Sequence, residues 1–238
     1  MEKLRILSAE WGAPLGRPQI SLLAAYADIL ANYQLANVIG VRNRETIVLE
    51  HIIDSLSCLA LEDLPGDKSI VDVGTGGGLP GIPLAIACPN LHVTLLDARE
   101  KKVRFLQDAA ARLGLPNLQV LHARVEDAGR TAPYRDAFDL ATARALAPLP
   151  VLLEYCAPLV GIGGGILAMK GRLAEKELSQ GRTASTRLGA CLRDLREVNY
   201  HGLLPQKQRR LVIFEKIRAT PESFPRKAGL AKKRPLGN

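Results

Sequence analysis

The stretch SIVDVGTGGGLPG, residues 69–81, predicts a strand, a glycine-rich turn and the start of a helix, in that order. The strand is apolar apart from one carboxylate, Asp72. The turn that follows has glycines at positions 74, 76, 77 and 78. Glycine accepts positive φ angles and lets another molecule approach the backbone closely, so this turn is suited to binding a ligand.

A second unit of the same kind follows. Residues 92–107 read HVTLLDAREKKVRFLQ, which predicts a strand that ends at Asp97 and then a helix. Together the two units form a βαβ motif with an acidic residue at the carboxyl end of its second strand. A carboxylate at that place accepts hydrogen bonds from the ribose hydroxyls of a bound nucleoside. The pattern therefore predicts a nucleoside-binding site that includes Asp97.

Strands and helices alternate along the body of the chain, which is typical of a parallel sheet covered on both faces. Strands are expected at residues 69–74, 92–97, 118–124, 138–143 and 165–170, and helices at 82–88, 100–113, 149–160 and about 173–188. Two further strand-like runs, 193–203 and 209–217, have no helix between them and predict an antiparallel pair at the sheet edge. The expected fold class is α/β: a Rossmann-like, mostly parallel sheet with an antiparallel C-terminal strand pair.

The chain is expected to divide into three parts. Residues 1–64 carry helical patterns at 19–35 and 44–61 and predict a helical N-terminal cap. Residues 65–220 form the α/β domain. Residues 221–238 contain three prolines, five basic residues and one acid, and predict a basic tail that is solvated or bound to a partner rather than part of the core.

Composition excludes some classes of protein. The 238 residues are 47% hydrophobic, but no apolar run approaches the roughly 20 residues of a membrane span. The N-terminus lacks the apolar stretch of a signal peptide, so we expect a cytoplasmic protein with no membrane partner. A net charge of +8 is by itself weak evidence for nucleic acid. With 4% aromatic residues, a broad base-stacking platform is not expected.

No metal site is expected. The four cysteines, at positions 58, 88, 156 and 191, are far apart and predict small buried apolar residues. The four histidines show no spacing typical of ligands. Glu50, His51 and Asp54 can share one helix face, and we expect a packed, hydrogen-bonded contact there rather than a metal ion.

Two kinds of cofactor fit the glycine turn. Gly76, Gly78 and Gly81 match the dinucleotide fingerprint, with Asp97 about twenty residues further on, so an NAD-dependent dehydrogenase is one alternative. Against it, the turn is longer, the chain ends in an antiparallel pair, and about 140 residues remain after Asp97 for a substrate domain. The strand, the D-x-G-x-G-x-G turn and the second-strand acid instead resemble the class I S-adenosylmethionine-dependent methyltransferases.

A series of short segments narrows this resemblance. In order along the chain they are HIIDSL (51–56), VDVGTGGGLPGIPLAI (71–86), LLDAREKKVRFL (95–106), ARVED (123–127), TARALA (142–147), AMKG (168–171) and RRLVIFEK (209–216). The series resembles the bacterial small-subunit ribosomal RNA guanine-N7 methyltransferase G family, formerly called glucose-inhibited division protein B, over about residues 20–236. One difference is ANVIGV (36–41), where the family more often has Asn-Leu-Thr: Asn37 is kept and the threonine hydroxyl is absent.

The resemblance implies S-adenosylmethionine as cofactor and RNA of the small ribosomal subunit as substrate; we expect a monomer. The implied cofactor residues are Gly74, Gly76, Gly78, Leu79, Asp97, Val125, Glu126 and Arg144. Arg144 ends the fourth strand, and in the family the matching arginine lies by the cofactor and the reacting centre. It is therefore the candidate for positioning the target base.

Basic residues supply candidate RNA contacts. Lys101, Lys102 and Arg104 lie on the helix after Asp97, where a merely solvated face is an equal alternative. Arg124 and Lys170 lie with Arg144 at strand ends on one rim of the sheet, so the three could line one phosphate path.

The expected chemistry needs no general base, because guanine N7 carries a lone pair and no proton. Positioning and electrostatics would then supply the catalysis. Two alternatives stay open: a methyltransferase for protein or small molecules, and an RNA-binding ribosome-assembly factor with the same fold.

Overall fold

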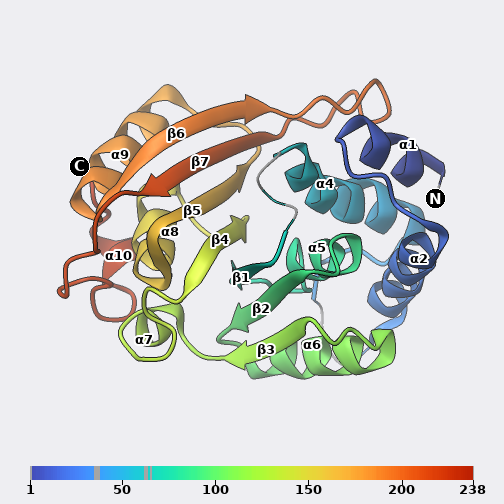
Figure 1. Ribbon diagram of the computed structural model, residues 1–238, viewed down its shortest axis with the longest axis horizontal. Helices are drawn as coiled ribbons and strands as arrows, with labels where there is room; N and C mark the ends of the chain where they lie inside the picture. Colours follow the sequence, from blue (N-terminus) through green and yellow to red (C-terminus); the bar gives the residue numbers. More distant parts are fainter. Residues whose placement is uncertain (1, 35–37, 62–63, 65, 238) are drawn as a thin grey trace.

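A computed structural model describes residues 2–34, 38–61, 64 and 66–237. In these residues the chain forms a seven-stranded sheet with helices packed on both faces (Figure 1). The strand order is β3-β2-β1-β4-β5-β7-β6, and neighbours are parallel except for β7, which runs antiparallel to β5 and β6. The predicted Rossmann-like α/β fold is confirmed.

The strands follow the predicted positions closely. They are β1 (Lys68–Val73), β2 (Leu91–Asp97), β3 (Leu118–His122), β4 (Phe138–Arg144), β5 (Val160–Lys170), β6 (Ala190–Glu197) and β7 (Arg210–Lys216). The largest difference is β5, which begins at Val160 rather than at residue 165. Its register with β4 shifts between Phe138 and Leu140, and the glycines at 163–165 supply the residues without side chains that such an irregularity needs.

The predicted antiparallel pair at the sheet edge is confirmed. β7 lies between β5 and β6, so β6 is the outermost strand; in Figure 1 the two cross the top of the molecule. β6 also ends at Glu197 rather than at residue 203, and a connection of irregular structure leads from there to β7.

The helices of one face come from both the N-terminal part and the α/β body. They are α1 (Glu2–Glu10), α2 (Arg17–Asn32), α5 (Gly81–Ala87), α6 (Glu100–Leu113) and a helical segment over residues 44–60. That segment changes its hydrogen-bond pattern along its length, from α3 (Arg44–Thr46) to the π-helix η1 (Ile47–Ile52), α4 (Ile53–Leu56) and the 3-10 helix η2 (Ser57–Ala60). Leu23 and Ile53 of the cap share one buried apolar cluster with Leu84 and Ile70 of the body.

The other face of the sheet is covered by α7 (Val125–Ala128), α8 (Leu149–Cys156), η3 (Ala157–Leu159), α9 (Glu175–Arg187) and α10 (Leu230–Lys233). Here the expectation that residues 221–238 lie outside the core is wrong. Phe224, Ala231 and Leu236 are buried in the same apolar cluster as α8. Arg226 forms an ion pair at 2.6 Å with Glu154, whose side chain is 1% exposed. The prediction followed the basic composition of this segment and did not take account of the three apolar residues that pack onto the body.

Two smaller findings concern composition. Cys58, Cys88 and Cys156 are buried free thiols, as predicted, while Cys191 is half-buried. In the described ranges, no helix combines the length and the apolar character that crossing a bilayer requires.

Candidate functional site

The carboxylate of Asp72 holds the glycine turn in place through hydrogen bonds. This carboxylate is fully buried, and its Oδ2 accepts hydrogen bonds from the Thr75 hydroxyl at 2.5 Å and the Gly81 backbone N–H at 2.8 Å. Burial raises the pKa of Asp72 to about 6, although both hydrogen bonds act to lower it. Asp72 therefore fixes the turn and the start of α5 rather than facing a ligand.

Asp97 lies directly beside the turn, as the sequence predicts. Its side chain is buried, and Oδ2 accepts a hydrogen bond from the Gly76 N–H at 3.0 Å while Oδ1 accepts one from the Arg99 N–H at 2.9 Å. Gly76 has a φ of +62°, a conformation that glycine adopts without strain. A carboxylate oxygen can accept more than one hydrogen bond, so Asp97 keeps acceptor capacity for a ligand.

A cavity of about 430 Å³ opens at the carboxyl ends of the strands, next to Asp97 and the turn. It is lined by Val73, Gly74, Leu96, Asp97, Ala98, Arg99, Lys102, Ala123, Arg124, Val125, Glu126, Ala145, Leu146, Tyr155 and Lys232. Four of the predicted cofactor residues, Gly74, Asp97, Val125 and Glu126, thus come together around one space. Ligands of open α/β sheets bind at this edge.

Four other predicted cofactor residues do not line that cavity. Leu79 is buried in the apolar cluster. A Cβ at Gly78 would lie 2.4 Å from Ile82 Cδ1, so this glycine packs against α5. Gly76 does not line the cavity itself, but its N–H donates to Asp97, and a Cβ built at Gly76 would lie 3.2 Å from Nζ of Lys102; both of these residues line the cavity. The fourth is Arg144, which belongs to a separate cluster of side chains.

Several lining residues escaped prediction. Tyr155 of α8 and Lys232 of α10 reach the cavity from the far side of the sheet. The predicted residue Glu126 connects α8 to the C-terminal segment. Its Oε1 accepts a hydrogen bond from the Gly229 N–H at 3.1 Å, and Tyr155 forms a hydrogen bond with its carboxylate. No local pattern marks these residues: the place of Lys232 depends on how the C-terminal segment folds back, and that of Tyr155 on how α8 packs on the sheet.

The basic residues on α6 separate into two groups. Lys101 and Arg104 are exposed, and Arg104 forms an exposed ion pair with Glu100 at 2.5 Å. Lys102 is half-buried and lines the cavity, so it differs from the exposed position that the sequence suggested.

The three strand-end cations lie in three different environments. Arg124 is exposed at the cavity rim. Lys170 forms an ion pair with Glu177 at 2.7 Å and donates to the Ala147 carbonyl at 3.2 Å, which ties β5 to α9. Arg144 is held by the N-terminal helical segment. A single phosphate path over all three stays a prediction.

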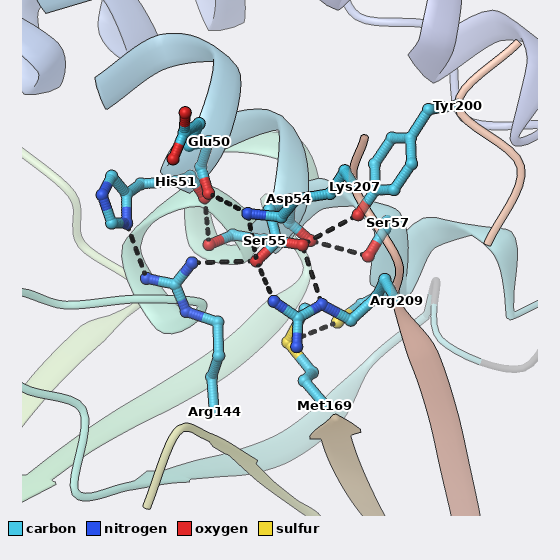
Figure 2. Close-up of polar contacts among 11 residues, drawn as sticks. Glu50, His51, Asp54, Ser55, Ser57, Arg144, Met169, Tyr200, Lys207 and Arg209 are labelled. Atoms are coloured by element: carbon cyan, nitrogen blue, oxygen red, sulfur yellow. Dashed lines mark hydrogen bonds and ion pairs between the residues drawn. The ribbon is translucent and has the colours of Figure 1, made fainter. Parts of the chain in front are cut away.

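Arg144 belongs to a cluster around Asp54, which Figure 2 shows. Arg144 Nη1 donates to Asp54 Oδ2 at 3.0 Å, and its Nη2 donates to His51 Nδ1 at 3.4 Å. Arg209 donates from Nε to Asp54 Oδ1 at 2.8 Å and from Nη2 to Oδ2 at 2.6 Å. The Tyr200 hydroxyl donates to Oδ1 at 2.8 Å. The predicted hydrogen-bonded role of His51 and Asp54 is confirmed, and it joins the cap to the sheet.

The charges of this cluster shift its pKa values. Burial acts to raise the pKa of Asp54, but the bonds from Arg209 and the nearby cations outweigh it and hold that pKa below its usual range. Burial, with Arg144 and Lys207 nearby, lowers the pKa of His51 to about 4. His51 is therefore neutral at physiological pH and accepts a hydrogen bond through Nδ1. Burial and the two arginines also lower the pKa of Lys207.

A larger hollow of about 600 Å³ lies at the opposite edge of the sheet, near Asp139 and Gly163. It is at the amino ends of β1 and β5, away from the glycine turn and from Asp97. We assign the candidate site to the smaller cavity, because the turn, the acidic strand end and the open strand ends meet there.

The segment ANVIGV lies partly outside the described residues, including Asn37. Ile39, which stands where the family has threonine, covers the turn: its Cγ2 would lie 2.6 Å from a Cβ at Gly77. Tyr26 of α2 also reaches the turn and donates its hydroxyl to the Gly77 carbonyl.

Comparison with known proteins identifies the family of this chain. The family model of rRNA small subunit methyltransferase G matches residues 19–204. A ribosomal RNA small subunit methyltransferase G of Rubrobacter xylanophilus is 50% identical over 95% of this chain and 87% of its own length. One of Acetivibrio thermocellus is 41% identical, covering 99% and 97%.

A solved structure supports the fold alone. The antibiotic-resistance methyltransferase Kmr superposes with a TM-score of 0.51 at 23% identity, over 64% of this chain and 88% of its own. Family model and relatives together extend over nearly the whole length of the sequence. The chain belongs to the family of rRNA small subunit methyltransferase G and is a methyltransferase.

Proposed function

We propose that this protein transfers a methyl group from S-adenosylmethionine to N7 of a guanine in the 16S RNA of the small ribosomal subunit. The methyltransferase class and its cofactor follow from the family. The target atom is the further step, and the surroundings of Arg144 support it.

The cavity beside the glycine turn is suited to the cofactor. Asp97 keeps acceptor capacity for two ribose hydroxyls. Gly74 lines the cavity together with Leu146, which packs against this glycine. Val125 and Glu126 form the wall suited to an adenine ring. When bound, S-adenosylmethionine supplies an electrophilic methyl group on a positively charged sulfur. The protein supplies orientation and excludes water from the reacting atoms.

The observation that carries the choice of N7 is the engagement of both proton acceptors beside Arg144. Asp54 accepts hydrogen bonds from two arginines and a tyrosine. His51 directs Nδ1 at Arg144, and its lowered pKa makes it a weak base. Neither group is available to remove a proton from a substrate. Guanine N7 has no proton to remove, whereas an exocyclic amine or a hydroxyl would need a base.

Arg144 is then a fixed donor at the carboxyl end of β4. It would hold the O6 edge of the target guanine and leave N7 open to the methyl group. A guanidinium usually binds O6 and N7 of guanine together, but a bond to N7 would occupy the attacking lone pair. A clamp that restricts Arg144 in direction supports contact with O6 rather than with N7.

The test is methylation of small subunits that lack the modification, with radiolabelled S-adenosylmethionine. Borohydride reduction and aniline cleave RNA selectively at N7-methylguanine. Label in 16S RNA with cleavage at one guanine is expected. Label at a position that resists cleavage would contradict N7. Label in protein would point to another substrate, and binding without label would point to an assembly factor.

We also propose that the protein acts as a cytoplasmic monomer built from the cap, the α/β domain and the C-terminal segment. Sedimentation velocity tests the oligomeric state, and fractionation of cells tests the compartment.

A further inference from the structure

The cluster around Asp54 holds more positive than negative charge. Arg144, Arg209 and Lys207 approach Asp54 Oδ2 at 3.0, 2.6 and 3.9 Å. The carboxylate of Asp54 is fully buried between these cations, and the carboxylate of Glu50 is exposed nearby. Three cations thus face one buried anion and one solvated anion. A site of this kind attracts an additional anion, because partial burial weakens screening by water.

The hydrogen-bonding capacity of the cluster is also unbalanced. Both oxygens of Asp54 are already bonded to Arg209, and Tyr200 and Arg144 add one bond each. Arg144 uses two donors, to Asp54 and His51, which leaves further N–H groups of the guanidinium without a partner among the described residues. Lys207 donates to the Glu50 carbonyl at 2.9 Å and keeps two more N–H groups.

Exposure separates the binding groups from their frame. The side chain of Lys207 is 24% exposed and that of Arg144 12%, while Asp54 is fully buried. Arg209 is 10% exposed and is committed to Asp54 through two parallel bonds. In Figure 2, Arg144 and Arg209 approach Asp54 side by side and Lys207 lies behind Asp54. Lys207 and Arg144 are therefore the two cations that an outside ligand can reach.

The cluster also lies at the reacting edge of the sheet. Arg144 is the last residue of β4, and in the register of the sheet β4 pairs with β1 just before the glycine turn, with Thr142 opposite Asp72. Tyr26, which bonds to the turn at Gly77, is close enough to Arg144 for that charge to act on its hydroxyl. An anion held here would lie next to the place where the methyl group is presented.

We propose that Arg144 and Lys207 form a binding site for a phosphate of the RNA backbone close to the target nucleotide, with Asp54 and Arg209 as its rigid frame. The proposal rests on the proposed function for the identity of the RNA. An oxyanion satisfies both the unused donors and the excess charge. Phosphate contacts fix the register of an RNA without reading its sequence, which is what presenting one base to the methyl group requires.

The test compares three variants with opposite expectations. Lys207→Gln removes the reachable cation, and Glu50→Gln removes the anion that competes with phosphate. Arg112→Gln is the control: Arg112 is 57% exposed in the last turn of α6, pairs with Asp108 rather than with Asp54, and its loss changes the net charge equally. Affinity for small-subunit RNA is measured over a range of salt concentrations.

Lys207→Gln is expected to weaken RNA binding about tenfold at low salt and to reduce the salt slope by about one. Glu50→Gln is expected to tighten binding, a gain that misfolding cannot produce. Arg112→Gln should leave both quantities close to those of the unmodified protein. Equal behaviour of Lys207→Gln and Arg112→Gln, or no gain for Glu50→Gln, overturns the proposal.

A second measurement separates this site from the proposed function. Inorganic phosphate is titrated into the full-length protein while the His51 imidazole is followed by NMR, against chloride at equal ionic strength. A bound anion should raise the pKa of His51, which lies beside both cations. A response of His51 to phosphate without RNA methylation would contradict the proposed function and support the phosphate site. RNA methylation without a response of His51 to phosphate would support the function and contradict the site.

Discussion

Asp54 and Arg209 are joined by two parallel hydrogen bonds, of 2.8 and 2.6 Å, although 155 positions separate them in the chain. Asp54 belongs to α4 of the cap, and Arg209 directly precedes β7. With Arg144 from the end of β4, the pair links the cap to two strands of the sheet. Bidentate bonds between a guanidinium and a carboxylate are short and directional, so they fix this arrangement more firmly than a point charge could.

Removing Asp54 should therefore destabilise the protein strongly. Asp54→Ala leaves Arg209, Arg144 and Lys207 with uncompensated charge in a buried place, which costs about 3–5 kcal/mol of unfolding free energy. Urea denaturation followed by circular dichroism measures it. The control is Asp194→Ala, since Asp194 and Arg196 form a pair with side chains 37% and 46% exposed. Such a pair contributes at most about 1 kcal/mol. Equal losses for the two variants would show that the cluster does not hold the cap in place.

Stability should depend on pH through His51. Its pKa is lowered from 6.5 to about 4, so the unfolded chain binds a proton in this range and the folded chain does not. The stabilisation is present above pH 6.5 and is lost as the pH falls towards 4. Asp72 acts in the opposite sense, because a pKa raised from 3.8 to about 6 makes folding more favourable as the pH falls through 6.

The two effects overlap, so the test uses a difference. His51→Gln keeps an acceptor but cannot titrate. Between pH 7 and pH 4.5, the unmodified protein is expected to lose more unfolding free energy than this variant. A difference that stays constant over this range would refute the lowered pKa.

Asp97 should determine cofactor affinity. Asp97→Ala removes the acceptor for the ribose hydroxyls and also releases the Gly76 N–H. The expected loss is about 1–3 kcal/mol in binding S-adenosylmethionine, measured by calorimetry. Asp108→Ala on α6, whose side chain is 47% exposed, is the control and should bind normally. Titration with NAD tests the dehydrogenase alternative, and strong binding of NAD with no response to S-adenosylmethionine would reverse our assignment.

Local patterns predicted the part of the fold that local chemistry determines. The glycine turn, Asp97 and the five parallel strands each depend on neighbouring residues, and all were found in place. The position of β7 between β5 and β6 was not predicted, because two adjacent strand patterns say nothing about which of them meets the sheet. The prediction that residues 221–238 lie outside the core was wrong for a similar reason. Phe224 and Ala231 are isolated apolar residues, and their burial depends on the surface of α8.

The residues of the candidate site also differ in how far the sequence predicts them. Asp54 stands among Ile52, Ile53 and Leu56, and a carboxylate in such an apolar helix pattern indicates a buried partner without identifying it. Arg209 and Lys207 could not be identified, since their contacts span most of the chain. Lys102 lines the cavity, and its Nζ would lie 3.2 Å from a Cβ at Gly76; this approach to the turn depends on tertiary packing and not on spacing along the helix alone.

The glycines of the turn should respond differently to substitution. At Gly76, a valine must accept a φ of +62° and displace only the flexible end of Lys102, so the fold should persist while cofactor binding is lost. At Gly78, a Cβ would lie 2.4 Å from Ile82 in the buried cluster, so Gly78→Val should lower the unfolding free energy as well. Circular dichroism and calorimetry on both variants measure the two effects. A stable Gly78→Val protein that fails to bind would place this glycine at the ligand instead.

The C-terminal segment should contribute to cofactor binding through Lys232. This side chain lines the cavity, and Gly229, three residues earlier, bonds to Glu126 on the wall suited to adenine. A deletion of residues 221–238 is an unsuitable test, because it also removes buried Phe224 and the Arg226–Glu154 pair. Lys232→Gln is expected to weaken binding of S-adenosylmethionine about threefold to tenfold, the loss of one hydrogen bond or charge contact.

The same loss should appear with adenosine as the ligand, because the contact is assigned to the adenine end of the cavity. Lys227→Gln is the matched control, since Lys227 is exposed on the same segment and does not line the cavity. If Lys232→Gln and Lys227→Gln bind both ligands equally well, the segment closes the cavity only by packing. If the loss appears with S-adenosylmethionine but not with adenosine, Lys232 contacts the amino-acid portion of the cofactor, and the orientation of the ligand in the cavity is the reverse of the one argued from Glu126.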